Sequence, residues 1–117
     1  MKDTIKPILG QSFGEILSVD VEFIEKGNTY FEQNVVESPF LAKIAAVNGV
    51  NLKEPIIIEY VVDKHLFEEA PCFKTGVKYS LKCYEDIYSM GNPIDWSTTP
   101  NQFNYEIHHR IFLRSAD

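Results

Sequence analysis

Three side chains near the carboxyl end have the types and spacing for acid–base chemistry. Glu106, His108 and Arg110 stand at alternate positions, so an extended chain places a carboxylate, an imidazole and a guanidinium on one face. Histidine titrates near neutral pH, and the flanking charges could orient a substrate. The same row is typical of the exposed face of an antiparallel strand, where neighbouring charges pair. We favour the exposed face and keep these three residues as the candidates for a small enzyme.

The cysteines and the other histidines give little support for nucleophilic or metal chemistry. The chain has no Gly-x-Ser-x-Gly motif, and Cys72 and Cys83 lie eleven positions apart. No Cys or His pair has the spacing that preforms a zinc site. We therefore expect no metal, no cofactor and two structural thiols. A disulfide between the two cysteines stays open, as does a reactive pair of Cys72 with His65.

Aromatic and amide side chains gather in two segments that are rich in turn-forming residues, 28–34 and 88–103. Aromatic rings supply contact area and amides supply directed hydrogen bonds, a combination found on recognition surfaces. These segments provide the candidate binding residues Tyr30, Phe31, Asn34, Tyr88, Asn92 and Trp96. The alternative is that the aromatic rings fold inward and plug one end of the fold.

The elements that would position these residues are β-strands. Period-two alternation and β-branched runs predict five strands, at residues 14–25, 40–47, 50–62, 76–85 and 103–113. Asn48-Gly49 between two apolar runs is the strongest short hairpin signal. Pro55 can open a strand but could not sit at its centre. Phe112 falls on the polar side of the last strand, so the register there stays open.

The connections are predicted from turn and capping residues. We expect a long loop over 26–39, with room for a short edge strand, because Ser38-Pro39 favours an extended or turned backbone. Asp63 can cap one or two helical turns that end before Pro71. A second long loop is predicted over 86–102, where glycine, proline and asparagine recur.

This order of elements is that of an oligonucleotide/oligosaccharide-binding (OB) barrel. We predict an all-β fold with one short helix, a five- to six-stranded antiparallel barrel with OB-like element order. It forms one domain, 1–117, in which residues 1–12 can be a loosely ordered arm. The two aromatic-rich segments would then meet at one end. A meander, a lipocalin-like barrel or a sandwich would produce much of the same order.

The net charge of the chain restricts the classes of molecule that it can bind. The chain has 17 acidic and 11 basic side chains and a formal charge of −6, with most of the excess acid in residues 13–69. Nucleic-acid binding usually draws on clustered Lys and Arg, so we expect no nucleic-acid partner. Met1 is not followed by the apolar run of a signal peptide, and no segment is long enough to span a bilayer. We therefore expect a cytoplasmic protein with no membrane partner.

These observations favour a non-enzymatic binding module that engages a protein through its loops or an acidic face. One version is an inhibitor or immunity-type protein that masks a basic enzyme by charge complementarity. The alternative is a small enzyme, or a barrel that binds a small molecule or saccharide, with the polar row on the last strand as its site. A homodimer formed through a strand edge is a further possibility.

Overall fold

The computed structural model describes residues 6–27, 30–32, 35–65, 73–87 and 111–116, with the backbone alone for 30–32, 35–37 and 63–65. It contains the strands β1 (Leu17–Lys26), β2 (Tyr30–Glu32), β3 (Val35–Val47), β4 (Val50–His65), β5 (Lys78–Ile87) and β6 (Ile111–Ser115). The described residues include no helix. The predicted all-β class is confirmed.

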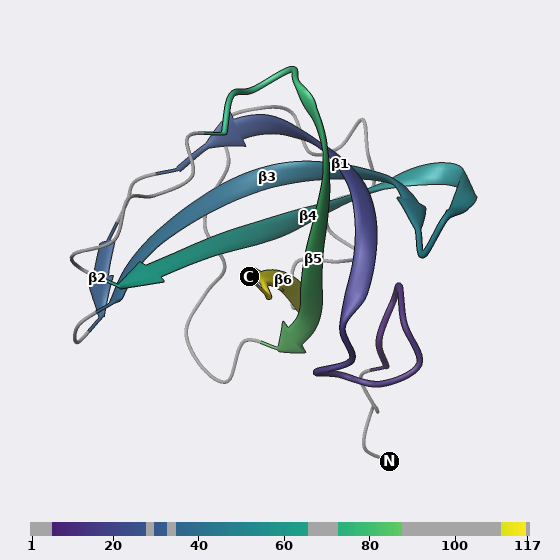
Figure 1. Cartoon of the computed structure of the whole chain (residues 1–117), viewed down its shortest axis with the longest axis horizontal. Helices are drawn as coiled ribbons and strands as arrows, with labels where there is room; N and C mark the ends of the chain where they lie inside the picture. Colours follow the sequence, from purple (N-terminus) through teal and green to yellow (C-terminus); the bar gives the residue numbers. More distant parts are fainter. Residues whose placement is uncertain (1–5, 28–29, 33–34, 66–72, 88–110, 117) are drawn as a thin grey trace, which may run out of the picture.

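The strands form one sheet that closes on itself (Figure 1). Their order is β1-β5-β6-β4-β3-β2, and β1 also pairs with β3, so five strands form a ring with β2 outside it. The order of these five strands along the chain is the OB-like order predicted from the sequence. The predicted antiparallel pairing needs one correction, because β4 and β6 are parallel and the sheet is therefore mixed. β6 lies between β5 and β4, and since it is antiparallel to β5 it runs in the direction of β4.

The period-two alternation of β1 and β5 sorts their side chains as predicted. Val19, Val21 and Phe23 point into the ring and are at most 2% exposed, whereas Asp20 between them is exposed. On β5, Cys83 is fully buried and follows exposed Lys82. Burying such side chains on one face is what makes a strand pair in a single register, since a slip by one residue would expose all of them.

The long β-branched run in β4 reflects burial on both sides of the sheet. Ile58 and Tyr60 point into the ring, and the alternate residues Ile57, Glu59 and Val61 are also buried, at 0–2% exposure. A strand with two buried faces requires a nearly continuous apolar sequence. The sequence of this run therefore does not indicate which of its residues point into the ring.

The predicted hairpin is confirmed at Asn48 and Gly49, whose φ angles of 52° and 81° are both in the left-handed region. The Asn48 side chain accepts a hydrogen bond from the Ser18 amide at 2.9 Å, and the Asn48 amide donates to the Ser18 carbonyl at 2.6 Å. The pairing of β3 with β4 is interrupted between the pair of Ile44 with Ile56 and the pair of Ala46 with Asn51. Residues 52–55 of β4, which include Pro55, and Ala45 of β3 are unpaired there. The prediction that Pro55 could not lie inside a strand is therefore wrong, because an irregularity of this kind tolerates a proline within β4.

The predicted loop over 26–39 is too long. β3 already begins at Val35 and continues through Pro39, which pairs with Val61. The Pro39 carbonyl accepts a hydrogen bond from the Gly27 amide at 2.8 Å, just beyond the end of β1. The N–H and C=O of one strand residue point to the same edge. The nitrogen of Pro39, which carries no hydrogen, therefore faces the edge of β3 toward Gly27. The hydrogen bonds between β3 and β4 are not affected by it.

The start of the predicted helix is also wrong. Residues 63–65 continue β4 and pair with β3, with Asp63 opposite Glu37 and His65 opposite Val35. Because β3 begins earlier than predicted, it offers partners to these residues, and pairing outweighs the capping tendency of Asp63. The remainder of the predicted helix, to Ala70, lies outside the described residues.

Phe112 lies on the outer side of β6 and is nevertheless buried, at 5% exposure. It pairs in register with Glu59 on β4 and Asp86 on β5. The Arg114 guanidinium lies over its ring at 5.0 Å and contacts the Asp86 carboxylate at 3.5 Å. The contact with the Arg114 guanidinium shields the Phe112 ring and accounts for an apolar residue on the polar side of the strand. Residues 103–110 of the predicted strand lie outside the described part.

Aromatic rings close one end of the ring of strands. The Phe23 ring lies 4.6 Å from Phe40, 5.2 Å from Phe73 and 5.8 Å from Tyr79, measured between ring centroids. Phe73 belongs to a segment before β5 whose Gly76 amide donates to the Phe23 carbonyl at 2.8 Å. Tilted and edge-to-face contacts of this kind add to the burial of the rings themselves.

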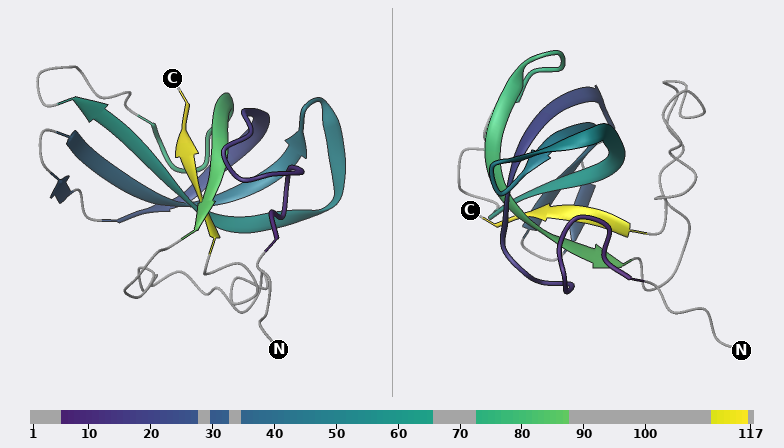
Figure 2. Two further views of the ribbon diagram at one scale, coloured as in Figure 1. Left: turned by 90° about the horizontal axis from the view of Figure 1, so that it is seen from below. Right: turned by 90° about the vertical axis from the view of Figure 1, so that its right-hand side faces the viewer.

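Residues 6–16 form a strap that packs against the end of β5 (Figure 2). The carboxylate of Glu85, itself 1% exposed, accepts hydrogen bonds from three successive amides: Ile8 at 2.6 Å, Leu9 at 3.1 Å and Gly10 at 2.7 Å. Ile8, Leu9 and Phe13 of the strap pack against the core. A buried carboxylate is stable only with such partners, so Glu85 and the strap hold each other in place.

Replacing Glu85 by Gln should lower the free energy of unfolding by about 1–3 kcal/mol, since one carbonyl oxygen cannot accept three amide hydrogen bonds and the new NH₂ group opposes an amide donor. Denaturant unfolding measures the loss, and faster hydrogen exchange at Ile8, Leu9 and Gly10 locates it. Glu54→Gln, the same change at an exposed position, is the control. Equal stability of the two variants would refute this role of Glu85.

Gly49→Ala should destabilise the protein by about 1–2 kcal/mol, because its φ of 81° is costly for a residue with a Cβ atom. An added Cβ would meet no atom within 4 Å, so the cost is conformational and not steric. Gly49→Asn should lose less, since asparagine tolerates this region better. Denaturant unfolding of both variants makes the comparison. If the two variants lose the same free energy, the conformational explanation fails.

Candidate functional site

The structure describes few of the residues that the sequence marks as candidates. Tyr30 and Phe31 lie on the short strand β2, of which the backbone alone is described. The others lie outside the described residues: Asn34, Tyr88, Asn92, Trp96, Glu106, His108 and Arg110. Their roles in binding or acid–base chemistry therefore stay predictions.

The two aromatic-rich segments do not leave the ring of strands at one end. The first follows Lys26 at the end of β1, and the second follows Ile87 at the end of β5. β1 and β5 are antiparallel, with Leu17 opposite Cys83 and Glu22 opposite Lys78. Their final residues therefore lie at opposite ends of this strand pair. Most of both segments lies outside the described residues, so the expectation that they meet at one end stays a prediction.

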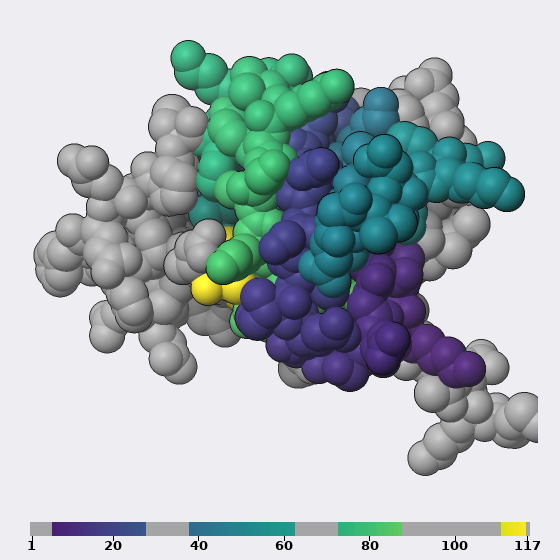
Figure 3. Space-filling view, turned by 45° about the vertical axis from the view of Figure 1, so that its right-hand side comes forward, coloured from purple at the N-terminus to yellow at the C-terminus, as the bar shows by residue number. Residues whose placement is uncertain are grey.

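A hollow of about 480 Å³ opens on the outer face of β1 and its two neighbours, β3 and β5. Figure 3 looks toward this side of the molecule, where β1 lies between β5 in green and the hairpin of β3 and β4 in teal. The hollow is lined by Asp20, Val21, Glu22, Lys43, Ala45, Pro55, Lys78, Tyr79 and Ser80. Its volume is within the range of ligand-binding clefts.

Charges of opposite sign alternate across the hollow. Glu22 on β1 pairs in register with Lys43 on β3 and with Lys78 on β5, so the order across the three strands is positive, negative, positive. Beside this row, the Ser80 hydroxyl donates a hydrogen bond of 2.9 Å to the Asp20 carboxylate. Each of these side chains stands on a paired strand, which fixes its position more closely than a loop would.

The two lysines of the hollow carry no ion pair within the described part of the chain. No carboxylate oxygen of a described residue lies within 4.0 Å of the ammonium group of Lys43 or Lys78. Glu22 therefore stands between them without contacting either ammonium group at that distance. Their charges remain available to a ligand.

The described surface is less acidic than the whole chain. The described side chains include as many bases as acids: the bases are Lys6, Lys26, Lys43, Lys53, Lys74, Lys78, Lys82 and Arg114, and the acids are Glu15, Asp20, Glu22, Glu25, Glu54, Glu59, Glu85 and Asp86. Glu59 and Glu85 are buried, at 2% and 1% exposure. The acid excess of the sequence therefore belongs to side chains outside this set, and the acidic face stays a prediction.

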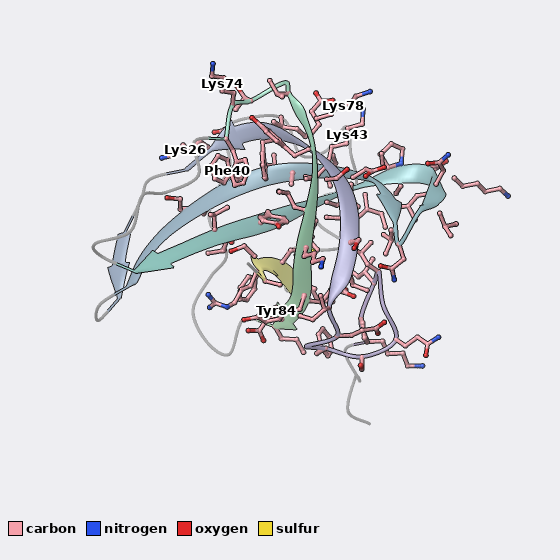
Figure 4. The ribbon with its side chains drawn as sticks, viewed as in Figure 1. Lys26, Phe40, Lys43, Lys74, Lys78 and Tyr84 are labelled. Atoms are coloured by element: carbon pink, nitrogen blue, oxygen red, sulfur yellow. The ribbon has the colours of Figure 1, made fainter. Side chains whose placement is uncertain are left out.

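Four lysines lie toward the end that the aromatic rings close. Figure 4 shows Lys26, Lys43, Lys74 and Lys78 in the upper part of the view, around the β1–β3 and β1–β5 pairs. The sequence indicates only that Lys78 lies on the polar side of an alternating strand and that Lys43 is the single charged residue of the run 40–47. The sequence could not show that two of them flank the same residue of β1, because that depends on the register of two long-range pairings.

The hollow has the chemistry of a binding site. Its lining residues carry two carboxylates, two ammonium groups and two hydroxyls; the Ser80 hydroxyl donates to the Asp20 carboxylate, and the Tyr79 hydroxyl accepts from the Lys74 amide. Among the residues that the structure describes, no group of three His, Cys, Asp or Glu could hold a metal ion. The arrangement can orient a charged ligand, and its described groups include no activated nucleophile.

Cys83 is a free thiol in the core. Burial, with a smaller contribution from the negative charge of Glu85, raises its pKa from 9.0 to about 12. The thiolate is the reactive form of cysteine, so Cys83 is inert at neutral pH. This agrees with its prediction as a structural residue.

Comparisons with protein-family models, with curated proteins and with solved structures found no match to this chain. The part of the chain that the structure describes has no helix long and apolar enough to cross a membrane.

The raised pKa of Cys83 should make the protein less stable in alkali. Above about pH 9 the unfolded thiol ionises while the folded thiol stays protonated up to about pH 12, so the unfolded state is favoured as pH rises. We expect the stability advantage of the wild type over Cys83→Ala to shrink as the pH rises from about 9 toward about 12, by at most about 1.4 kcal/mol per pH unit. Denaturant unfolding at each pH measures it, and a constant difference would contradict the shift.

Proposed function

We propose that this protein is a non-enzymatic binding module that engages a protein partner through the outer face of β3, β1 and β5. The observation that supports this is the hollow on that face, where Lys43 and Lys78 flank Glu22 and neither lysine has an ion-pair partner among the described residues. Exposed charges in a fixed order serve recognition because they steer a partner and reject surfaces of the wrong charge.

The face also suits a protein partner by its shape. The hollow is open to solvent along a sheet surface, and its walls come from three strands and from the bulge that contains Pro55. Interfaces between proteins combine a small number of anchoring side chains with a wider polar surround. One partner side chain could enter the hollow while its neighbours rest on the exposed residues of β1 and β5.

The inhibitor or immunity-type version remains part of this proposal. It rests on the small size of the chain and its charge of −6. The acidic side chains that would face a basic enzyme lie largely outside the set that the structure describes, as do most residues of the two aromatic-rich segments. In this version the hollow provides orientation and the other segments provide contact area.

Charge reversal in the hollow tests the proposal. The protein, tagged and immobilised, is used to capture partners from a lysate of its source cells, in parallel with Lys43→Glu/Lys78→Glu and with the control Lys53→Glu/Lys82→Glu. The control makes the same change of charge at two exposed lysines that do not line the hollow. We expect a protein that the wild type and the control retain and that the hollow variant loses by about tenfold or more.

Equal melting temperatures of the three proteins will show that they are equally folded. If the hollow variant and the control retain the same proteins in the same amounts, this face is not the binding surface. If the wild type retains small metabolites or saccharides and no protein, the protein-partner proposal is wrong.

A further inference from the structure

We propose that the hollow receives an acidic segment of the partner, an extended peptide whose carboxylates stand two residues apart and therefore on the same face of the peptide. This inference rests on the proposed function and specifies the chemistry of the partner at the same site. It also differs from what the whole-chain charge of −6 suggests, since that charge alone points to a basic partner.

The spacing of the two lysines fits such a segment. Lys43 and Lys78 lie on the strands that flank β1, at the level of Glu22. Neighbouring strands are about 4.8 Å apart, so the backbones at the two lysines are separated by roughly 10 Å. In an extended peptide, side chains two residues apart point to the same face and are separated by about 6.6 Å. Lysine side chains are long and flexible enough to converge on carboxylates at this smaller spacing.

Glu22 determines what can lie between the two carboxylates. Its own carboxylate stands midway between the lysines and would repel a third negative charge placed opposite it. A residue with a hydroxyl, an amide or a free backbone N–H can instead donate a hydrogen bond to it. The hollow therefore favours acidic residues separated by uncharged polar ones, and it disfavours an uninterrupted acidic run.

The scaffold holds this arrangement in place before a ligand arrives. The backbone amide of Lys74 donates to the Tyr79 hydroxyl at 2.9 Å, and Tyr79 packs against Phe73 at 4.9 Å between ring centroids. These contacts fix the start of β5, where Lys78 stands. Exposed Lys74 adds a further positive charge toward the same end of the molecule (Figure 4). A surface that is ordered in advance loses less entropy on binding.

A nucleic acid fits this surface less well. A phosphate backbone carries a charge at every nucleotide, and both Asp20 and Glu22 line the hollow. The acid excess of the whole chain adds a general repulsion of a long polyanion, which is strongest at low salt. A short peptide places its charges close to the lysines and little charge elsewhere.

Titration with defined probes tests the inference. The first probe is a short capped peptide of alternating Glu and Ser, and the second is a single-stranded oligothymidylate of the same charge. Binding is followed by the amide NMR shifts of the full chain, for the wild type, for Lys43→Gln/Lys78→Gln and for the control Lys53→Gln/Lys82→Gln. The variants lose the same charge, and neither pair makes an ion pair among the described residues.

We expect the peptide to shift the amides of residues 20–22, 43–45 and 78–80, and its Kd to rise about fivefold or more in the hollow variant, as the loss of two exposed ion pairs predicts. The Kd of the control should change less than about twofold. Binding should weaken at higher salt. A peptide of alternating Lys and Ser should produce no shifts at these residues.

Three results would overturn the inference: no binding of the acidic peptide, equal weakening in the hollow variant and the control, or tighter binding of the oligothymidylate that depends on Lys43 and Lys78. Failure here together with successful capture of a protein partner through the hollow would leave the proposed function standing and reject the acidic chemistry alone. Failure of both experiments would reject the site.

Discussion

The double pairing of β1 is the constraint on which the rest of the structure depends. β1 pairs with β3 along one edge and with β5 along the other, and this is the step that turns an open sheet into a ring. Pairing on both edges removes a free strand edge and fixes β1 in two registers at once. The two registers therefore also fix where its inward residues Val19, Val21 and Phe23 pack in the core. Because successive side chains alternate across a strand, the outward residues Asp20 and Glu22 are fixed by the same registers.

Both ends of this ring need closing, and the chain closes each with a different interaction. At one end aromatic rings pack around Phe23, so the closure is apolar and comes from residues next to the strands themselves. At the other end the strap of residues 6–16 is held by the Glu85 carboxylate, which receives three backbone amides. The polar closure is the more specific of the two, since a buried carboxylate without those donors would cost far more than the contact contributes. Glu85 thus fixes where the strap lies, and Ile8, Leu9 and Phe13 add burial once it is there.

The sequence predicts the strands best where a local pattern governs them. Alternation gave β1 and β5, and Asn48-Gly49 gave the hairpin, because those signals are properties of consecutive residues. Errors arose where a partner distant in the sequence decided the outcome. Asp63 reads as a helix cap, yet it extends β4 because β3 begins at Val35 and provides a partner. Glu85 reads as an acid near the end of a strand, and its burial depends on amides more than 70 residues away. The hollow was not predicted for the same reason, since the pairing of β1 with β3 and with β5 brings Lys43, Glu22 and Lys78 together.

The same alternation that builds the core keeps the outer face of β1 separate from it. A change at Lys43 or Lys78 leaves the inward residues of β3 and β5 in place, because neither side chain enters the core. β4 differs, since its outer residues Ile57, Glu59 and Val61 are buried and a charge placed there would face a large desolvation cost. Within the described sheet, the side that can vary without loss of the fold is therefore the side around β1, and that is where the hollow and its alternating charges lie. The core and the hollow thus lie on opposite faces of one strand, and the ring closure that fixes the inward residues also sets the positions of Asp20 and Glu22.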